Sequence, residues 1–356
     1  MANRLPQVRR RLQDLDADAI LLSSLPNVRW ACGFTGSNGL LLVGRRDAVF
    51  VTDGRYTEQA REEVDGAEVV IAENGLVTRL QELEYFSDLH EVVFQADHVT
   101  VARQKQLEEH LSEVRWTGES SILTHQVAEK ESDEVDQIRR AQAITEAVFE
   151  HVLESLEPGR TEQEVAAEIT YQHLLRGAEK MAFDPIVASG PNGARPHARP
   201  TDRRLREGDL VVLDMGCLRD GYASDMTRTV ALGTPSAQAR RGYQVVREAQ
   251  ERALEAARAG LTGKELDAVA REVIEGADLG DYFAHGLGHG IGLEVHEWPR
   301  VSRTAENELP EGACVTIEPG VYVPEEGYGV RIEDIVVLTS DGCENLTTTT
   351  KELLVL

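Results

Sequence analysis

Two acidic residues in the second half of the chain lie where a charge is costly. Asp214 stands near the end of the apolar run Asp209–Met215, which has the composition of a buried strand. Asp225 lies in Tyr222–Val230, a second predicted strand after a turn at Leu218–Gly221. A lone carboxylate costs several kcal/mol to bury unless it is paired or bound to a metal. We expect a hairpin on which Asp214 and Asp225 face each other.

A second pair of acids repeats this arrangement further along the chain. Glu318 follows the apolar run Cys314–Ile317, and Glu333 lies in the run Gly329–Val337. Carboxylates that face each other in one apolar site repel, so their coexistence predicts bound cations.

Three histidines lie between the two acidic pairs. The segment Ala284–Pro299 reads A-H-G-L-G-H-G-I-G-L-E-V-H-E-W-P and contains His285, His289 and His296. The spacing of the first two is typical of zinc-binding helices, but glycine at alternate positions disfavours a helix. We therefore predict an extended strand that brings the histidines to a shared centre. The alternative, a solvated histidine patch, is disfavoured by the apolar residues between them.

Four carboxylates and one imidazole form an oxygen-rich ligand set. Their combined negative charge balances two divalent cations, and such hard ligands suit manganese or cobalt at least as well as zinc. Two neighbouring metal ions can bridge and activate a water and polarise a carbonyl. The ligand set therefore predicts a hydrolase.

The first third of the chain alternates apolar and amphipathic segments, which predicts an α/β domain with a mixed central sheet. The predicted strands are Asp18–Leu22, Gly39–Val43, Ala48–Thr52, Glu68–Ile71 and Glu91–Phe94, and the amphipathic segments include Tyr56–Val64 and Val101–Leu111. The apolar periodicity lapses near Ile122–Glu131. We place the domain boundary there, giving domains 1–122 and 123–356.

The second domain begins with a predicted long helix and contains a faint internal repeat. Ser132 is a plausible N-cap for that helix, which Glu157-Pro158-Gly159 ends. The pattern G-x-T-x-x-E occurs at residues 159–164 and again at 260–265, and each copy is a capping box that opens an amphipathic helix. The carboxylate pairs follow the two copies in parallel order, which favours a duplicated α+β domain.

Composition limits the partners and the compartment. The chain has 356 residues, enough for two domains, and a formal net charge of −25. Such a charge disfavours nucleic acid and anionic membranes as partners. The chain start has no apolar core of a secretory signal, and we find no apolar stretch of the ~20 residues that span a bilayer. We expect a soluble, cytoplasmic protein. The four cysteines form no C-x-x-C pair and predict neither disulfides nor a zinc-thiolate site.

In these motifs the chain resembles the pita-bread metallopeptidases, most closely prolidases (Xaa-Pro dipeptidases) and the related aminopeptidase P. The motifs are A-F-D-P-I-V-A-S-G (182–190), D-L-V-V-L-D-M-G (209–216), S-D-M-T-R-T (224–229), H-G-L-G-H-G-I-G-L-E-V-H-E-W-P (285–299), T-I-E-P-G-V-Y (316–322) and G-V-R-I-E-D (329–334). Residues 26–39 and 52–56 resemble the creatinase-type domain that precedes the peptidase domain in this family. The resemblance implies that α/β domain followed by an α+β pita-bread catalytic domain with a pseudo-twofold repeat.

The resemblance also implies roles for individual residues. The two metal ions would be held by Asp214, Asp225, His289, Glu318 and Glu333, with manganese favoured and cobalt or zinc as alternatives. Glu318 would also relay a proton, His197 and His296 would hold the substrate carboxylate and the tetrahedral intermediate, and His285 and Arg331 would line the site. From the residues alone, His197 is an ordinary loop histidine and Arg331 could equally form a surface ion pair.

The implied activity is metal-dependent hydrolysis of trans Xaa-Pro dipeptides by a metal-bridged hydroxide, in a homodimer. The first alternative is aminopeptidase P, which acts on longer peptides; the segment Gly33–Asn38, which resembles a lid that limits substrate length, would separate the two. A third alternative, methionine aminopeptidase, is disfavoured because that enzyme lacks the N-terminal domain. A non-catalytic binding protein on the same fold, or metal-free chemistry like that of creatinase, is disfavoured because all five ligand positions are intact.

Overall fold

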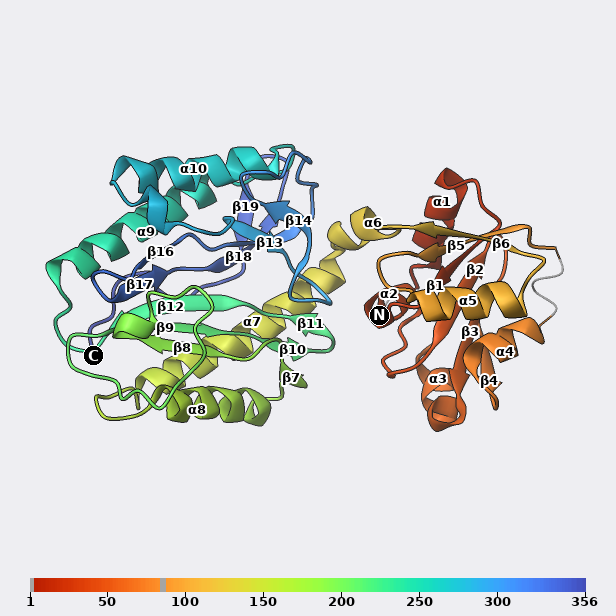
Figure 1. Ribbon diagram of the computed structural model, residues 1–356, viewed down its shortest axis with the longest axis horizontal. Coiled ribbons are helices and arrows are strands. Elements are labelled where there is room, and N and C mark those ends of the chain that lie inside the picture. The colour runs from red at the N-terminus through yellow and green to blue at the C-terminus, as the bar shows by residue number, and fades with distance from the viewer. Residues whose placement is uncertain (1–2, 84–87) are drawn as a thin grey trace. The chain divides into compact units, whose positions relative to one another are not determined.

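The structure is a computed structural model that describes residues 3–83 and 88–356 (Figure 1). The chain divides into two compact units, Met1–Val127 and Ala128–Leu356. Each unit has its own sheets and its own buried apolar core.

The first unit is built on one six-stranded mixed sheet with strand order β4-β3-β2-β1-β5-β6. Its strands are β1 (Ala19–Leu22), β2 (Leu40–Gly44), β3 (Ala48–Asp53), β4 (Glu68–Ala72), β5 (Glu91–Gln95) and β6 (Arg115–Glu119). Its helices are α1 (Leu5–Asp14), α2 (Leu25–Cys32), η1 (Gly54–Tyr56), α3 (Thr57–Glu63), α4 (Leu76–Gln81), α5 (Val101–His110) and α6 (Thr124–Ala128), which runs into the second unit. The five predicted strands and the mixed sheet are confirmed. The edge strand β6 is largely polar and half-exposed, so no apolar run marks it.

The second unit places short sheets between two pairs of helices (Figure 1). The helices are α7 (Ser132–Leu153), α8 (Glu162–Leu175), α9 (Ala237–Ala256) and α10 (Gly263–Gly276), with the 3₁₀ turns η3 (Gly190–Asn192) and η4 (Gly280–Tyr282). The strands are β7 (Lys180–Met181), β8 (Ile186–Ser189), β9 (Leu210–Met215), β10 (Cys217–Arg219), β11 (Tyr222–Ala223), β12 (Met226–Ala231), β13 (Gly288–Gly290), β14 (Glu297–Val301), β15 (Cys314–Ile317), β16 (Gly320–Val323), β17 (Tyr328–Arg331), β18 (Asp334–Leu338) and β19 (Cys343–Asn345).

Two apolar cores reflect the predicted duplication. Helices α7 and α8 share a core with β8, β9 and β12, while α9 and α10 share one with the strands from β15 to β18. The predicted capping boxes are confirmed. Thr161 Oγ1 accepts from the Glu164 backbone N–H, and Thr262 Oγ1 accepts from that of Glu265, at 3.1 Å each. The two halves therefore open their second helices in the same way.

The predicted N-cap of the long helix is wrong by one residue. Ser132 is the first residue of α7, and Glu131 is the N-cap. The Glu134 side chain accepts from the Glu131 backbone N–H at 3.1 Å, so an acidic pair takes the place of the expected serine cap. The Asp133 and Glu134 charges still favour the helix N-terminus.

The long predicted strands around the acidic residues are interrupted. Tyr222–Val230 divides into β11 and β12, and Gly329–Val337 divides into β17 and β18. The predicted turn at Leu218–Gly221 is also too long, because Leu218 and Arg219 belong to β10. The histidine segment is extended only over β13 and from β14 onwards.

Within the described ranges, none of the helices combines the length and the apolar character that crossing a bilayer requires. The four cysteines are free thiols, and Cys32, Cys217 and Cys314 are buried, as small apolar residues are.

Candidate metal centre

The acidic residues of the centre gather where strands end. Asp214 lies within β9 and pairs in register with Thr227 of β12, while Asp225 immediately precedes β12. Glu318 directly follows β15, and Glu333 lies in the break between β17 and β18. Strand ends free the side chains from the alternation of a continuous ladder, so acids from both halves can point to one place.

Thr227 joins the two halves of the unit. Its carbonyl oxygen accepts from the Glu333 backbone N–H at 3.1 Å, and its Oγ1 donates to Glu333 Oε2 at 2.7 Å. The hydroxyl therefore fixes one oxygen of Glu333 and leaves the other free.

His289 is held by the neighbouring strand β15 and by its own strand β13. Its backbone N–H donates to Thr316 Oγ1 at 3.1 Å, and its Nδ1 lies 3.1 Å from the Gly290 carbonyl oxygen, which suits a protonated Nδ1. The other ring nitrogen, Nε2, then faces Asp225 Oδ2 at 3.8 Å and Glu318 Oε1 at 3.3 Å. Hydrogen bonding at one nitrogen in this way is how proteins orient a histidine that binds metal through the other.

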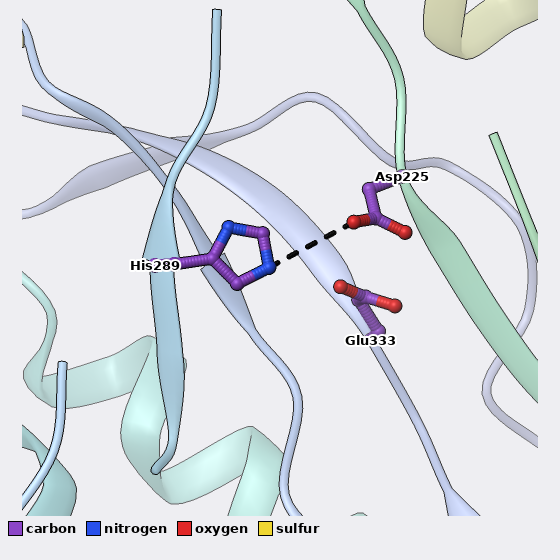
Figure 2. A group of neighbouring side chains, drawn as sticks. All are labelled: Asp225, His289 and Glu333. Carbon is purple, nitrogen blue, oxygen red and sulfur yellow. Dashed lines mark ion pairs between the residues drawn. The ribbon is translucent and has the colours of Figure 1, made fainter. Parts of the chain in front are cut away.

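Three of the predicted ligands meet closely enough to share one ion. Asp225, His289 and Glu333 each offer an atom, and these atoms lie within 4.8 Å of one another. Figure 2 shows the three side chains converging from separate segments, with the His289 ring directed at Asp225. The mixture of two carboxylates and one imidazole suits a first-row divalent metal.

The fourth predicted ligand, Asp214, pairs with Arg331. Asp214 Oδ2 accepts from Arg331 Nη2 at 2.5 Å, whereas its Oδ1 is buried and has no hydrogen-bond partner among the described residues. A buried oxygen without a partner is costly. A cation beside Asp214 Oδ1 would satisfy it, so Asp214 fits a metal-ligand role.

Arg331 donates hydrogen bonds to several groups of the centre. Besides Asp214, its guanidinium donates to Tyr322 Oη at 2.6 Å, to Thr227 Oγ1 at 3.1 Å and to the Pro196 carbonyl oxygen at 3.2 Å. The alternative of a surface ion pair is thus excluded, because only 4% of Arg331 is exposed.

The carboxylates repel one another strongly in the metal-free protein. Burial raises the pKa of Asp225 well above its usual range, and the charges of Glu333, Asp214 and Glu318 add to that rise. Burial also raises the pKa of Glu333, together with Glu318 and Asp214. Within residues 3–83 and 88–356, no lysine or arginine forms an ion pair with Asp225 or Glu333. Divalent cations would supply the missing positive charge.

The pKa of Glu318 is lowered, whereas those of Asp225 and Glu333 are raised. Burial alone would raise its pKa, but the hydrogen bond with His289 and the His289 charge lower the pKa of Glu318 to about 2. The same contact raises the pKa of His289 against the effect of burial. The contact therefore favours an ionised Glu318 and a protonated His289, and a metal ion at His289 would compete with that proton.

The remaining predicted histidines lie around this centre. His285 is half-buried, its Nε2 lies 2.9 Å from Tyr322 Oη, and burial lowers its pKa. His296 is exposed, and its ring centroid lies 4.4 Å from that of His289. His197 is exposed on the loop after η3, near enough to His285 and His296 to contribute to the lowered pKa of each.

Sequence reasoning missed Tyr322 and Thr227. Tyr322 connects Arg331 to His285, and burial raises its pKa to about 12, so it remains a protonated hydroxyl near neutral pH. Tyr322 ends the motif T-I-E-P-G-V-Y, from which only Glu318 was predicted as a site residue. Thr227 could have been found by pairing the Asp209–Met215 strand with S-D-M-T-R-T, since register places it opposite Asp214.

Known proteins match both units. Residues 136–340 match metallopeptidase family M24, and residues 4–139 match the creatinase/prolidase N-terminal domain. The chain belongs to metallopeptidase family M24. This M24 chain is 37% identical to the Xaa-Pro dipeptidase of Pyrococcus horikoshii, over 95% of this chain and 94% of that protein.

Solved M24 structures share the fold over nearly the full length. The Xaa-Pro dipeptidase from Bacillus anthracis superposes with a TM-score of 0.96 at 36% identity, covering 99% of each chain. The X-Pro aminopeptidase from Thermotoga maritima gives 0.92 at 36% identity, covering 98% of this chain and 100% of that one. Membership makes the protein a peptidase, and therefore a hydrolase, that uses divalent metal ions. The predicted creatinase-type and pita-bread architecture is confirmed.

Proposed function

We propose that this protein is a prolidase that hydrolyses Xaa-Pro dipeptides. The observation that carries the proposal is the convergence of Asp225, His289 and Glu333 in an M24 catalytic unit. Full-length relatives named Xaa-Pro dipeptidase support the substrate class.

We assign two divalent metal ions, manganese by preference, to Asp214, Asp225, His289, Glu318 and Glu333. The uncompensated carboxylates and the unpartnered Asp214 oxygen support this assignment. When bound, two such ions supply an activated water and polarise the scissile carbonyl.

The substrate explains why such a site is needed. The nitrogen of an Xaa-Pro bond carries no hydrogen, and the proline ring fixes φ. A peptidase that holds its substrate by the scissile N–H has nothing to bind. Binding through the carbonyl and the two chain ends avoids this requirement.

Glu318 is the proposed proton carrier. Its low pKa keeps it ionised at neutral pH, and Thr316 Oγ1 donates to its Oε1 at 3.2 Å, which fixes its position. An ionised, oriented carboxylate can take a proton from the attacking water and deliver it to the departing proline nitrogen. Its side chain is 17% exposed, so the substrate can reach it.

His197 and His296 are the proposed substrate contacts. Both are exposed beside the centre, where their imidazoles can donate hydrogen bonds to the C-terminal carboxylate of a dipeptide and to the tetrahedral intermediate. His285 and Arg331 act more indirectly, through the Tyr322 hydroxyl and Asp214. A cytoplasmic homodimer, as in our sequence-based expectation, completes the proposal.

The second candidate, an aminopeptidase P activity on longer peptides, is favoured by the similarity to the Thermotoga maritima enzyme. Purified protein loaded with manganese should be given Ala-Pro and Ala-Pro-Gly-Gly at equal concentrations, and the release of alanine measured. We expect kcat/KM for the dipeptide to exceed that for the tetrapeptide at least about tenfold, which is 1.4 kcal/mol of discrimination. Equal or faster cleavage of the tetrapeptide would replace the dipeptidase assignment with the aminopeptidase one.

A further inference from the structure

The loop that carries His197 has little regular structure of its own. Between β8 and β9, residues 190–209 form only the short turn η3, yet the loop must hold His197 beside the centre. The Pro196 carbonyl oxygen of this loop also accepts from Arg331 Nη1 at 3.2 Å. Its position therefore affects both a proposed substrate contact and the partner of Asp214.

A buried carboxylate holds this loop at Ser189, the residue before it, and at Thr201. Glu162, the first residue of α8, has no exposed surface. Its Oε1 accepts from the Ser189 backbone N–H at 2.8 Å and from Ser189 Oγ at 2.7 Å. Its Oε2 accepts from the Thr201 backbone N–H at 3.0 Å and from Thr201 Oγ1 at 2.6 Å. Asn192 Nδ2 donates to Oε2 at 2.9 Å.

The side chain at position 162 must accept hydrogen bonds through both of its terminal atoms. A backbone N–H faces each oxygen of Glu162, and only a carboxylate accepts at both positions. The position at the N-terminus of α8 further favours a negative charge. The backbone carbonyls of Thr201 and Arg203 in turn accept from the first N–H groups of α8, so helix and loop are tied in both directions.

The backbone of this loop contacts strand β17. A Cβ atom on Gly329 of β17 would lie 1.8 Å from the Gly193 carbonyl oxygen, so loop and strand are in backbone contact there. Arg331 lies on the same strand. A shift of the loop would therefore move the groups around Asp214 as well as His197.

The other half of the duplicated unit uses a similar device. On α10, Asp267 Oδ1 accepts from the Leu287 backbone N–H at 3.0 Å, and Arg271 donates to the carbonyl oxygens of Phe283 and His285. A buried acid on the capped helix of each half thus holds a histidine-bearing segment.

We propose that Glu162 is a positioning residue of the active site, which sets the loop 189–201 so that His197 and the Pro196 carbonyl reach the centre. The inference rests on the proposed function for its kinetic consequence. The placement of the loop can be measured without activity.

The test compares Glu162→Gln with Glu164→Gln. Glutamine at position 162 must direct its NH₂ group at either the Ser189 or the Thr201 backbone N–H, so one anchor is lost whichever way the amide turns. Glu164→Gln removes the same charge two residues away on the exposed face of the same helix, and glutamine still closes a capping box. Differences between the variants therefore report on the loop and not on helix charge.

We expect hydrogen exchange to quicken at residues 189–201 in Glu162→Gln but not in Glu164→Gln. We also expect kcat/KM for Ala-Pro to fall about 10- to 100-fold in Glu162→Gln only, with metal content unchanged, because small misplacements of active-site groups have effects of this size. On a His197→Ala background the further loss should shrink severalfold, because the two changes act through one group.

Unchanged loop exchange in Glu162→Gln would overturn the inference whatever the activity. The inference would also be overturned if the loss of kcat/KM in Glu162→Gln added fully to that of His197→Ala and the same loss occurred in Glu164→Gln. If the wild-type protein does not cleave Ala-Pro, the proposed function fails while the exchange comparison still decides the role of Glu162. If Glu162→Gln does not fold, Glu162→Asp, which keeps both acceptor oxygens on a shorter stem, allows the same comparison.

Discussion

Replacing Asp225 with asparagine is expected to reduce kcat/KM for Ala-Pro at least about 10³-fold and to lower the bound metal per chain. Asp225 is one of the three side chains that lie close enough to share an ion, and metal ions in such sites contribute several kcal/mol of transition-state stabilisation. Steady-state kinetics and elemental analysis of the purified variant measure the two effects. Asp220→Asn, an exposed carboxylate on the neighbouring hairpin turn, is the matched control and should match the wild type.

The same substitution should stabilise the metal-free protein at neutral pH. Burial and the neighbouring acids raise the pKa of Asp225 above its unfolded value, so its contribution to stability is present below the unfolded pKa and is lost as the pH rises through the folded pKa. Asparagine has no carboxyl proton to lose and therefore acquires no buried negative charge as the pH rises. The gain in the metal-free melting temperature should therefore be larger at pH 8 than at pH 4.

Normal turnover and metal content in Asp225→Asn would contradict the ligand assignment.

Replacing Arg331 with alanine is expected to destabilise the metal-free protein by about 3–5 kcal/mol. Breaking a buried ion pair by removing one partner has this effect, because the other charge is left uncompensated. Here Asp214 would lose its cation, and Tyr322, Thr227 and the Pro196 carbonyl would lose a donor. Urea unfolding of the metal-free variant measures the loss.

Metal should restore part of that stability, since a divalent cation can replace the guanidinium charge beside Asp214. Arg331→Lys keeps a positive charge but not the planar fork that reaches four acceptors, so we expect an intermediate loss. Arg139→Ala breaks an exposed pair with Glu344 and is the control, with an expected effect of at most about 1 kcal/mol. An effect of Arg331→Ala no larger than that of Arg139→Ala would refute the role given to Arg331.

Local sequence patterns were sufficient for much of the fold. Thr161 and Thr262 predicted two helix starts because a capping box is completed within four residues. Apolar runs such as Ala48–Thr52 predicted strands because burial follows composition. Strand β6 escaped prediction because its residues are polar and its pairing with β5 is not local.

The acidic residues of the centre were predictable, but their connections were not. Asp225 and Glu333 follow from residue type and spacing, whereas only the family resemblance selects His289 among the three histidines. The three side chains lie close enough to share one ion. Their place at strand breaks was missed, because a break depends on long-range contacts such as that of Thr227 with Glu333. Glu162 was unrecognised for the same reason: in the sequence it is one more acid in the first turn of a helix, and its partners lie in a distant loop.

We propose that this M24 chain hydrolyses Xaa-Pro dipeptides with divalent metal ions held by Asp214, Asp225, His289, Glu318 and Glu333. The most direct measurement is the release of free proline from Ala-Pro by protein stripped of metal with a chelator and then reloaded with manganese, cobalt or zinc. We predict no release before reloading, restored release with at least one of the three metals, and much slower cleavage of Ala-Ala by the same sample. Equal release before and after reloading, or no release although metal is bound, would contradict the claim.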